Sequence, residues 1–79
     1  MPSEYEVIIA DDPHHEKVFA EIHLRGKFIA LISQEQGRHR LMVELPGPGL
    51  EETQVERRVP LTDFVIMLQA AAKKLVGKA

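Results

Sequence analysis

The sequence contains no cysteine, and neither acidic nor basic residues predominate. Without cysteine there can be no disulfide scaffold, cysteine nucleophile or cysteine zinc site. Small secreted domains usually depend on disulfides, and residues 1–5 show no leader pattern, so we expect a cytoplasmic protein. A formal net charge of −2 gives no electrostatic argument for binding nucleic acid or an anionic membrane. The apolar runs are far shorter than the roughly 20 residues of a spanning helix, so we expect no membrane partner.

The composition is that of a small globular protein. Of 79 residues, 44% are hydrophobic and 28% are charged, which are ordinary proportions for a folded domain. We therefore expect a single domain over residues 1–79. A chain of this length buries only about 60% of its unfolded surface, so its stability margin is small.

Two turn-rich segments, residues 11–16 and 46–49, divide the chain. Around them, alternating or continuous apolar residues predict four strands, which span residues 5–10, 17–25, 28–34 and 38–45. Residues 54–59 could add a short edge strand. The pairing of that segment is left open by the sequence.

The C-terminal region has the pattern of an amphipathic helix. Thr62 is a suitable N-cap, Gly77 is a suitable stop, and the spacing predicts a helix over residues 62–76. Its apolar stripe consists of Phe64, Met67, Leu68, Ala71 and Leu75. The predicted fold class is α+β, with an antiparallel meander of four to five strands and one C-terminal helix on one face.

Turn chemistry predicts the register of the sheet. A two-residue Gly26-Lys27 turn would place Ile22 opposite Leu31. The next turn could hold two residues, which would bury Glu44, or three residues, 35–37, with Gly37 in a left-handed conformation. The three-residue turn avoids burying a charge, so it is preferred. The predicted helix-covered face then consists of Val18, Ala20, Ile22, Leu24, Ile29, Leu31, Leu41, Val43 and Leu45.

One helix covers one face of a sheet, so the second face should be free. This second face should also contain Arg25, Ala30 and Glu44. We predict an interaction role for the rest of it, and we call that set the predicted interaction face: Phe19, Glu21, His23, Phe28, Ile32, Arg40 and Met42. Its mixture of apolar and charged side chains is typical of non-obligate protein interfaces. We expect a homodimer or a protein partner, because two-fold dimers are the commonest small oligomers.

The strongest candidate for metal chemistry is the turn that contains His14 and His15, with carboxylates nearby. Adjacent side chains on an extended chain point apart, and no second cluster of ligands is evident. A metal-binding or enzyme-accessory role is therefore an alternative, not the main prediction. The sequence has no known catalytic signature, and we predict neither an enzyme nor a cofactor.

A second alternative is weak binding of single-stranded nucleic acid. Arg38, Arg40, Arg57 and Arg58 could form a basic strip if residues 54–59 lie beside the fourth strand. Glutamates flank these arginines, and exposed ion pairs of this kind contribute little. Nucleic acid is therefore an improbable partner on the grounds of charge.

Three segments carry a resemblance to known sequences: residues 26–35 (GKFIALISQE), 44–49 (ELPGPG) and 58–61 (RVPL). Together they resemble a family of short, uncharacterised bacterial proteins. Some small proteins of this general build are immunity proteins that neutralise a toxin. The resemblance implies a bacterial cytoplasmic protein and supplies no catalytic residue.

Overall fold

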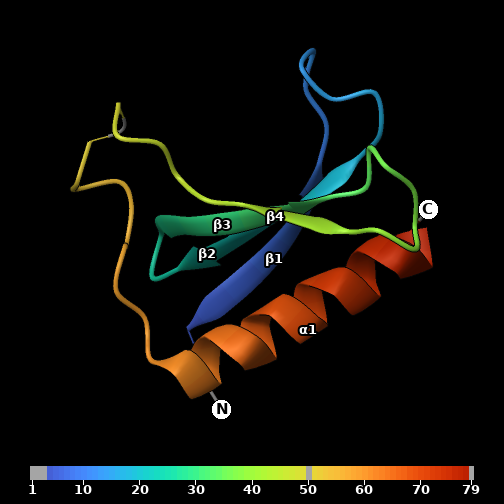
Figure 1. Cartoon of the computed structure of the whole chain (residues 1–79). Coiled ribbons are helices and arrows are strands. Elements are labelled where there is room, and N and C mark those ends of the chain that lie inside the picture. The colour runs from blue at the N-terminus through green and yellow to red at the C-terminus, as the bar shows by residue number, and fades with distance from the viewer. Residues whose placement is uncertain (1–3, 50, 79) are drawn as a thin grey trace.

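The computed structural model describes residues 4–49 and 51–78, and Figure 1 shows the arrangement of its strands and helix. The elements in chain order are β1 (Tyr5–Ala10), β2 (Phe19–Leu24), β3 (Lys27–Ser33), β4 (Met42–Glu44) and α1 (Leu61–Lys78). The strands form one antiparallel four-stranded sheet in the order β1-β2-β3-β4. The predicted α+β class, meander order and C-terminal helix are confirmed.

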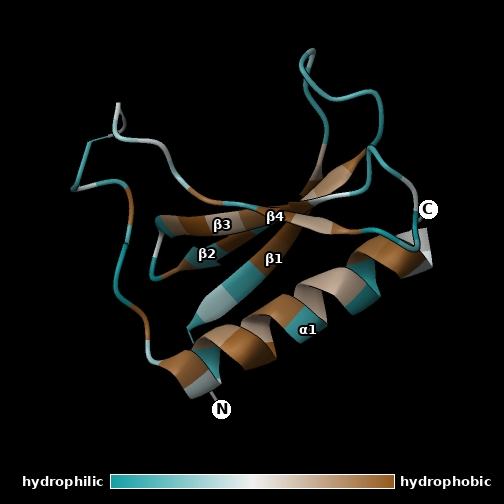
Figure 2. Ribbon diagram, in the orientation of Figure 1, coloured by the Kyte–Doolittle hydropathy of each residue, from teal (hydrophilic) through white to brown (hydrophobic). Residues whose placement is uncertain are grey.

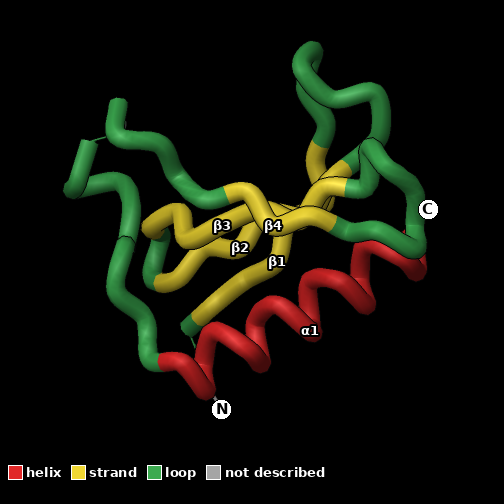
Figure 3. Tube along the Cα trace, in the orientation of Figure 1, coloured by secondary structure: helices red, strands yellow, loops and turns green. Residues whose placement is uncertain are grey.

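The helix lies along one face of the sheet (Figure 3). Among the described residues, α1 lies closest to β2 and β1, approaches β3 less, and does not reach β4. The apolar colouring in Figure 2 is concentrated on the strands and on α1. The fully buried core consists of Ala20, Ile22, Ile29, Ala30, Ile32, Met67, Ala71 and Leu75. The predicted helix stripe is confirmed, because Phe64 and Leu68 pack against this core.

The helix begins and ends slightly outside its predicted limits. Phe64 donates its backbone N–H to the Pro60 carbonyl at 2.9 Å, so the first turn starts before Thr62, and Thr62 is not the N-cap. Gly77 lies inside the helix and does not stop it. No helix within residues 4–49 and 51–78 has the length and hydropathy that a membrane span requires.

The turn between β2 and β3 differs from the prediction by one residue. The central residues are Arg25 and Gly26, with φ of 51° and 81°, and Leu24 pairs with Lys27. Two successive positive φ angles are the requirement of a type I′ hairpin turn, in which glycine takes the second position. This correction alone leaves every side chain on its predicted face, because it moves the register by two residues.

A β-bulge then exchanges the faces of the far half of β3. His23 pairs with Phe28, but Ile22 pairs with Ala30, so Ile29 is an extra residue between them. The predicted pairing of Ile22 with Leu31 is wrong. Bulges of this kind insert one unpaired residue into a strand. Because β3 is apolar on both faces, its sequence pattern could not specify where the register shifts.

The bulge moves three predicted side chains to the opposite face. Ala30 and Ile32 belong to the core under α1, although both were predicted on the second face. Leu31 pairs with Glu21 and Glu44 instead, on the face away from the helix. We call this the distal face, and its central residues are Ile8, Phe19, Glu21, His23, Phe28, Leu31, Met42 and Glu44.

β4 is shorter than the strand predicted over residues 38–45. Gly37 has the expected left-handed conformation, with φ of 104°, but a second turn follows in which Arg40 N–H bonds the Gly37 carbonyl. That turn uses residues that were assigned to the strand. Val43 consequently pairs with Ile32 and Glu44 with Leu31. The predicted three-residue turn would have paired Val43 with Ile29, so that prediction is also wrong.

Residues 54–59 do not form a strand. They make one parallel bridge, in which Phe28 donates to the Gln54 carbonyl at 2.9 Å and accepts from Glu56 N–H at 3.0 Å. The bridge places Val55 beside Phe28, where it is 3% exposed. The segment therefore lies at the edge of β3 beyond the end of β4, and not beside β4.

Candidate interaction surface

The structure places four members of the predicted interaction face together and separates the other three. Glu21, His23, Phe28 and Met42 lie on the distal face. The remaining three, Phe19, Ile32 and Arg40, do not form a free surface with them. The prediction for Ile32 is wrong, because this side chain is buried in the core. Arg40 lies in the turn before β4.

Phe19 is on the distal face but is covered. Its exposed fraction is 2%, and the ring of His15 lies 4.6 Å from its ring centre. The loop of residues 11–17 thus folds back over this end of the sheet. The prediction of a fully open second face is therefore wrong at this end, because the loop was treated as a turn without a packing role.

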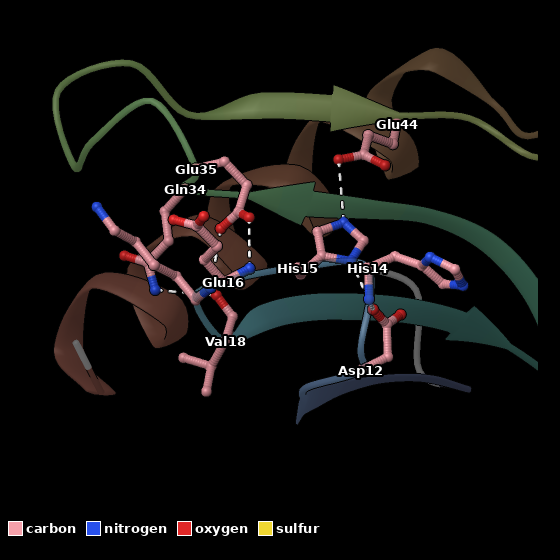
Figure 4. Close-up of polar contacts among 9 residues, drawn as sticks. Asp12, His14, His15, Glu16, Val18, Gln34, Glu35 and Glu44 are labelled. Atoms are coloured by element: carbon pink, nitrogen blue, oxygen red, sulfur yellow. Dashed lines mark hydrogen bonds and ion pairs between the residues drawn. The ribbon is translucent and has the colours of Figure 1, made fainter.

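Side chains from the loop that follows β3 hold residues 11–17 in place (Figure 4). The Glu35 carboxylate accepts from the backbone N–H groups of Glu16, at 2.6 Å, and Lys17, at 2.9 Å. Gln34 donates its side-chain amide to the Val18 carbonyl at 2.9 Å. These contacts give hydrogen-bond partners to the backbone N–H groups of Glu16 and Lys17 and to the carbonyl of Val18.

His15 connects this loop to the edge of the sheet. Its Nδ1 lies 2.9 Å from Asp12 Oδ1, and its Nε2 lies 3.4 Å from Glu44 Oε2 on β4 (Figure 4). An imidazolium can donate from both nitrogens, whereas the neutral ring can donate from only one. Hydrogen bonding to Asp12 and Glu44 raises the pKa of His15, and hydrogen bonding to His15 lowers the pKa of Asp12.

This arrangement does not converge on a metal. The two carboxylates occupy opposite nitrogens of the His15 ring, and Asp12 also accepts from the backbone N–H of His14 at 2.8 Å. In the described part of the chain, no group of three or more potential ligands is positioned to hold an ion. The geometry is therefore a hydrogen-bonded chain and not a ligand set.

Glu21 and His23 form a second half-buried pair, at 2.8 Å, on the distal face. The His23 ring also meets the edge of Phe28, with centres 5.7 Å apart. Ile29 and Phe64 line a groove on the helix side of the sheet, so this acid–base pair does not face that groove.

The edge strand β4 carries the most exposed apolar side chains of the sheet. The exposed fractions are 41% for Met42, 47% for Val43 and 68% for Leu45, which directly follows the strand. Leu41, Val43 and Leu45 alternate along the chain and therefore share the helix side. All three were predicted on the face covered by the helix. Leu41 does pack against the core under α1, but Val43 and Leu45 stay exposed because α1 does not reach β4.

The two edges of the sheet differ. At the β1 edge, Lys74 of α1 donates its ammonium group to the Val7 carbonyl at 3.0 Å. At β4, no side chain within residues 4–49 and 51–78 makes a comparable bond to the outer backbone. An exposed strand edge offers unpaired N–H and C=O groups to another strand. The edge at β4 is consequently the more accessible one.

A shallow groove of about 330 Å³ continues from the end of β4. Its apolar lining consists of Ile29, Leu45, Pro46, Val59 and Phe64, and its charged lining consists of Glu56 and Arg57. Arg57 bonds Glu52 at 2.8 Å and also the carbonyls of Pro46 and Gly47. These bonds attach the segment before α1 to the chain that leaves β4.

The four arginines considered for nucleic-acid binding do not form one strip. Arg38 donates to the Val76 carbonyl near the end of α1 at 2.8 Å, whereas Arg57 is held near Pro46 at the groove. The condition for the strip was that residues 54–59 lie beside the fourth strand, and they lie beside β3.

Comparison with known proteins identifies no relative of this chain. No family model matches the chain, and no curated protein or solved structure matches it either. The bacterial origin and the immunity role implied by the resemblance stay predictions.

Proposed function

We propose that the protein is a non-enzymatic interaction module of the cytoplasm that forms a homodimer through edge strand β4. The observation that carries the proposal is the exposed edge of β4, where the side chains of Val43 and Leu45 are exposed next to the half-buried Leu41. Exposed apolar edges are the sites at which sheets add strands from other chains. The same edge on a second copy of the chain can supply the added strand, as in a two-fold symmetric dimer.

The spacing of these side chains suits antiparallel pairing about a two-fold axis at Val43. In that register Val43 faces its own copy, and Leu41 faces the partner's Leu45, so the apolar stripe is complementary to itself. On the distal side Met42 faces the partner's Glu44. The paired strands would join two four-stranded sheets into one continuous sheet.

The pairing involves few residues, so we expect a weak dimer. Interfaces below about 1,200 Å² are usually transient. We expect a dissociation constant between about 1 µM and 1 mM. The dimer should therefore dissociate on dilution.

Sedimentation velocity and light scattering over about 10 µM to 1 mM test the proposal. Val43→Lys should give a monomer throughout, because two lysines would face each other at the axis. The matched control is Val65→Lys, since Val65 is an exposed valine (41%) on α1 away from the edge. That variant should dimerise like the wild type.

A wild-type chain that stays monomeric at about 1 mM would refute the proposal. Equal behaviour of the two lysine variants would also refute it. If Phe28→Asp abolished the dimer and Val43→Lys did not, the interface would lie on the distal face instead of the β4 edge.

A further inference from the structure

Residues 11–15 are the tip of the loop that covers Phe19, and hydrogen bonds within the tip hold its shape. The Asp12 carboxylate accepts from the backbone N–H of His14 at 2.8 Å, and the Asp12 carbonyl accepts from that of His15 at 3.2 Å. A bond from an Asp side chain to the backbone two residues further on makes an Asx turn, which mimics a backbone turn. The tip can therefore keep its shape without contacts to the sheet.

The tip is attached to the rest of the molecule in two different ways. At its base, side chains of the loop that follows β3 bond the backbone of residues 16–18, and no histidine takes part in these bonds. At its end, one polar contact joins residues 11–15 to the sheet within the part of the chain that the structure describes: His15 Nε2 lies 3.4 Å from Glu44 Oε2 (Figure 4). Loss of this one contact would free the tip while its base stays fixed.

The contact between His15 and Glu44 depends on the charge of the ring. A doubly protonated imidazole donates to Asp12 from Nδ1 and to Glu44 from Nε2. When one proton leaves, the shorter contact, at 2.9 Å to Asp12, keeps Nδ1 as the donor. Nε2 then presents a lone pair to a carboxylate oxygen. Two acceptors face each other, so the contact is lost.

The ring lies among groups that are mostly carboxylates. Its own loop contains Asp11, Asp12, His14, Glu16 and Lys17, β2 contributes Glu21 and His23, β4 contributes Glu44, and the loop after β3 contributes Glu35. β3 presents the uncharged Leu31 on this side. Hydrogen bonding to Asp12 raises the pKa of His15 above its usual 6.5, so the ring loses its charge at a higher pH than an unpaired histidine does.

We propose that His15 is a pH-dependent latch on the cover of Phe19. While the ring is charged, it holds the tip against β4, and Phe19 stays covered. When the ring becomes neutral, the tip lifts about its base and exposes Phe19. Release would enlarge the apolar part of the distal face, which already includes the exposed Ile8 and Met42. The latch belongs to a single chain, so this inference does not depend on the proposed homodimer.

NMR relaxation of the Cα carbons of residues 12–15, between about pH 5 and pH 9, tests the latch. In the wild type the order parameter should fall from about 0.85 to below about 0.6 as the His15 ring titrates. The resonances of the Phe19 ring should shift with the same midpoint. Samples that differ about tenfold in concentration should give equal midpoints, because release does not involve a second chain.

Variants of Glu44 separate the latch from a general loosening of the loop. Glu44→Ala removes the acceptor, so the tip should be mobile over the whole pH range. Glu44→Gln should keep the tip closed over that range, because an amide can accept from the charged ring and donate to the neutral one. The matched controls are His14→Gln, in the tip itself, and His23→Gln, on the distal face. Both should retain the wild-type transition.

Three results would overturn the proposal. The first is a tip that stays rigid while the His15 ring titrates. The second is a transition that disappears in His14→Gln or His23→Gln and persists in Glu44→Ala. The third is equal mobility of residues 16–18 and the tip above the midpoint, since the base should remain fixed. Circular dichroism at each pH confirms that the sheet and the helix are retained.

Discussion

Alanine substitutions at Leu31 and Ile32 provide a direct test of the sheet register. The two side chains are isomers on neighbouring positions of β3, so each substitution removes the same number of carbon atoms. Ile32 is 3% exposed in the core under α1, whereas Leu31 is half-buried on the distal face. The register predicted from the sequence would reverse these environments.

The structure predicts a large difference between the two variants. Truncation of a fully buried isoleucine costs about 2 to 5 kcal/mol, since the cavity adds to the lost transfer free energy. A half-exposed leucine on an open surface loses only part of that burial, so we expect about 1 kcal/mol for Leu31→Ala. A chain of 79 residues has a total stability of about 4 to 12 kcal/mol. Ile32→Ala therefore removes a large fraction of the stability.

Urea unfolding followed by circular dichroism measures both values. The protein should be kept at a few micromolar so that association does not contribute to stability. The wild-type, Leu31→Ala and Ile32→Ala curves should share one slope and differ in midpoint. If Leu31→Ala proved as destabilising as Ile32→Ala, the bulge at Ile29 and the assignment of faces derived from it would be refuted.

Two further predictions concern the His15 chain and the β2–β3 turn. Because the pKa of His15 is raised above its usual 6.5, its ion pairs should stabilise the fold below that pH and be lost as the pH rises through the folded-state value. The contribution of Asp12, whose pKa is lowered from 3.8, should be lost as the pH falls through its lowered value. An NMR titration of the His15 ring should give a lower pKa in Glu44→Gln, and an unchanged pKa would show that the contact is absent. Arg25→Asn should stabilise the protein by about 0.5 kcal/mol, because Asn-Gly is the preferred type I′ pair. A lower urea midpoint for this variant would contradict the turn assignment.

The fold class could be predicted because each of its determinants is local. Alternation in residues 17–25, the spacing of Met67, Ala71 and Leu75, and the turn-rich segments all depend on near neighbours in the chain. The left-handed Gly37 was predicted for the same reason, since only its own backbone conformation is involved.

The candidate site was predicted only in part. Four residues were assigned to the correct face: Glu21, His23, Phe28 and Met42. β2 alternates clearly, and Phe28 precedes the bulge in β3. Met42 keeps its predicted face although the pairing of β4 with β3 differs from the prediction. Phe19 was assigned to the correct face as well, but its cover by the loop was missed. No signal within residues 11–17 shows that His15 reaches Glu44, 29 positions further along the chain.

The sequence by itself determined the order of the elements, the apolar stripe of the helix and the existence of two unequal sheet faces. These follow from composition and periodicity, which act over a few residues. Only the tertiary structure decided the position of the bulge in β3, the limited reach of α1 and the exposure of β4. Each of these depends on how an 18-residue helix lies over a sheet whose third strand is apolar on both sides, so packing between distant segments, and not local preference, determines them.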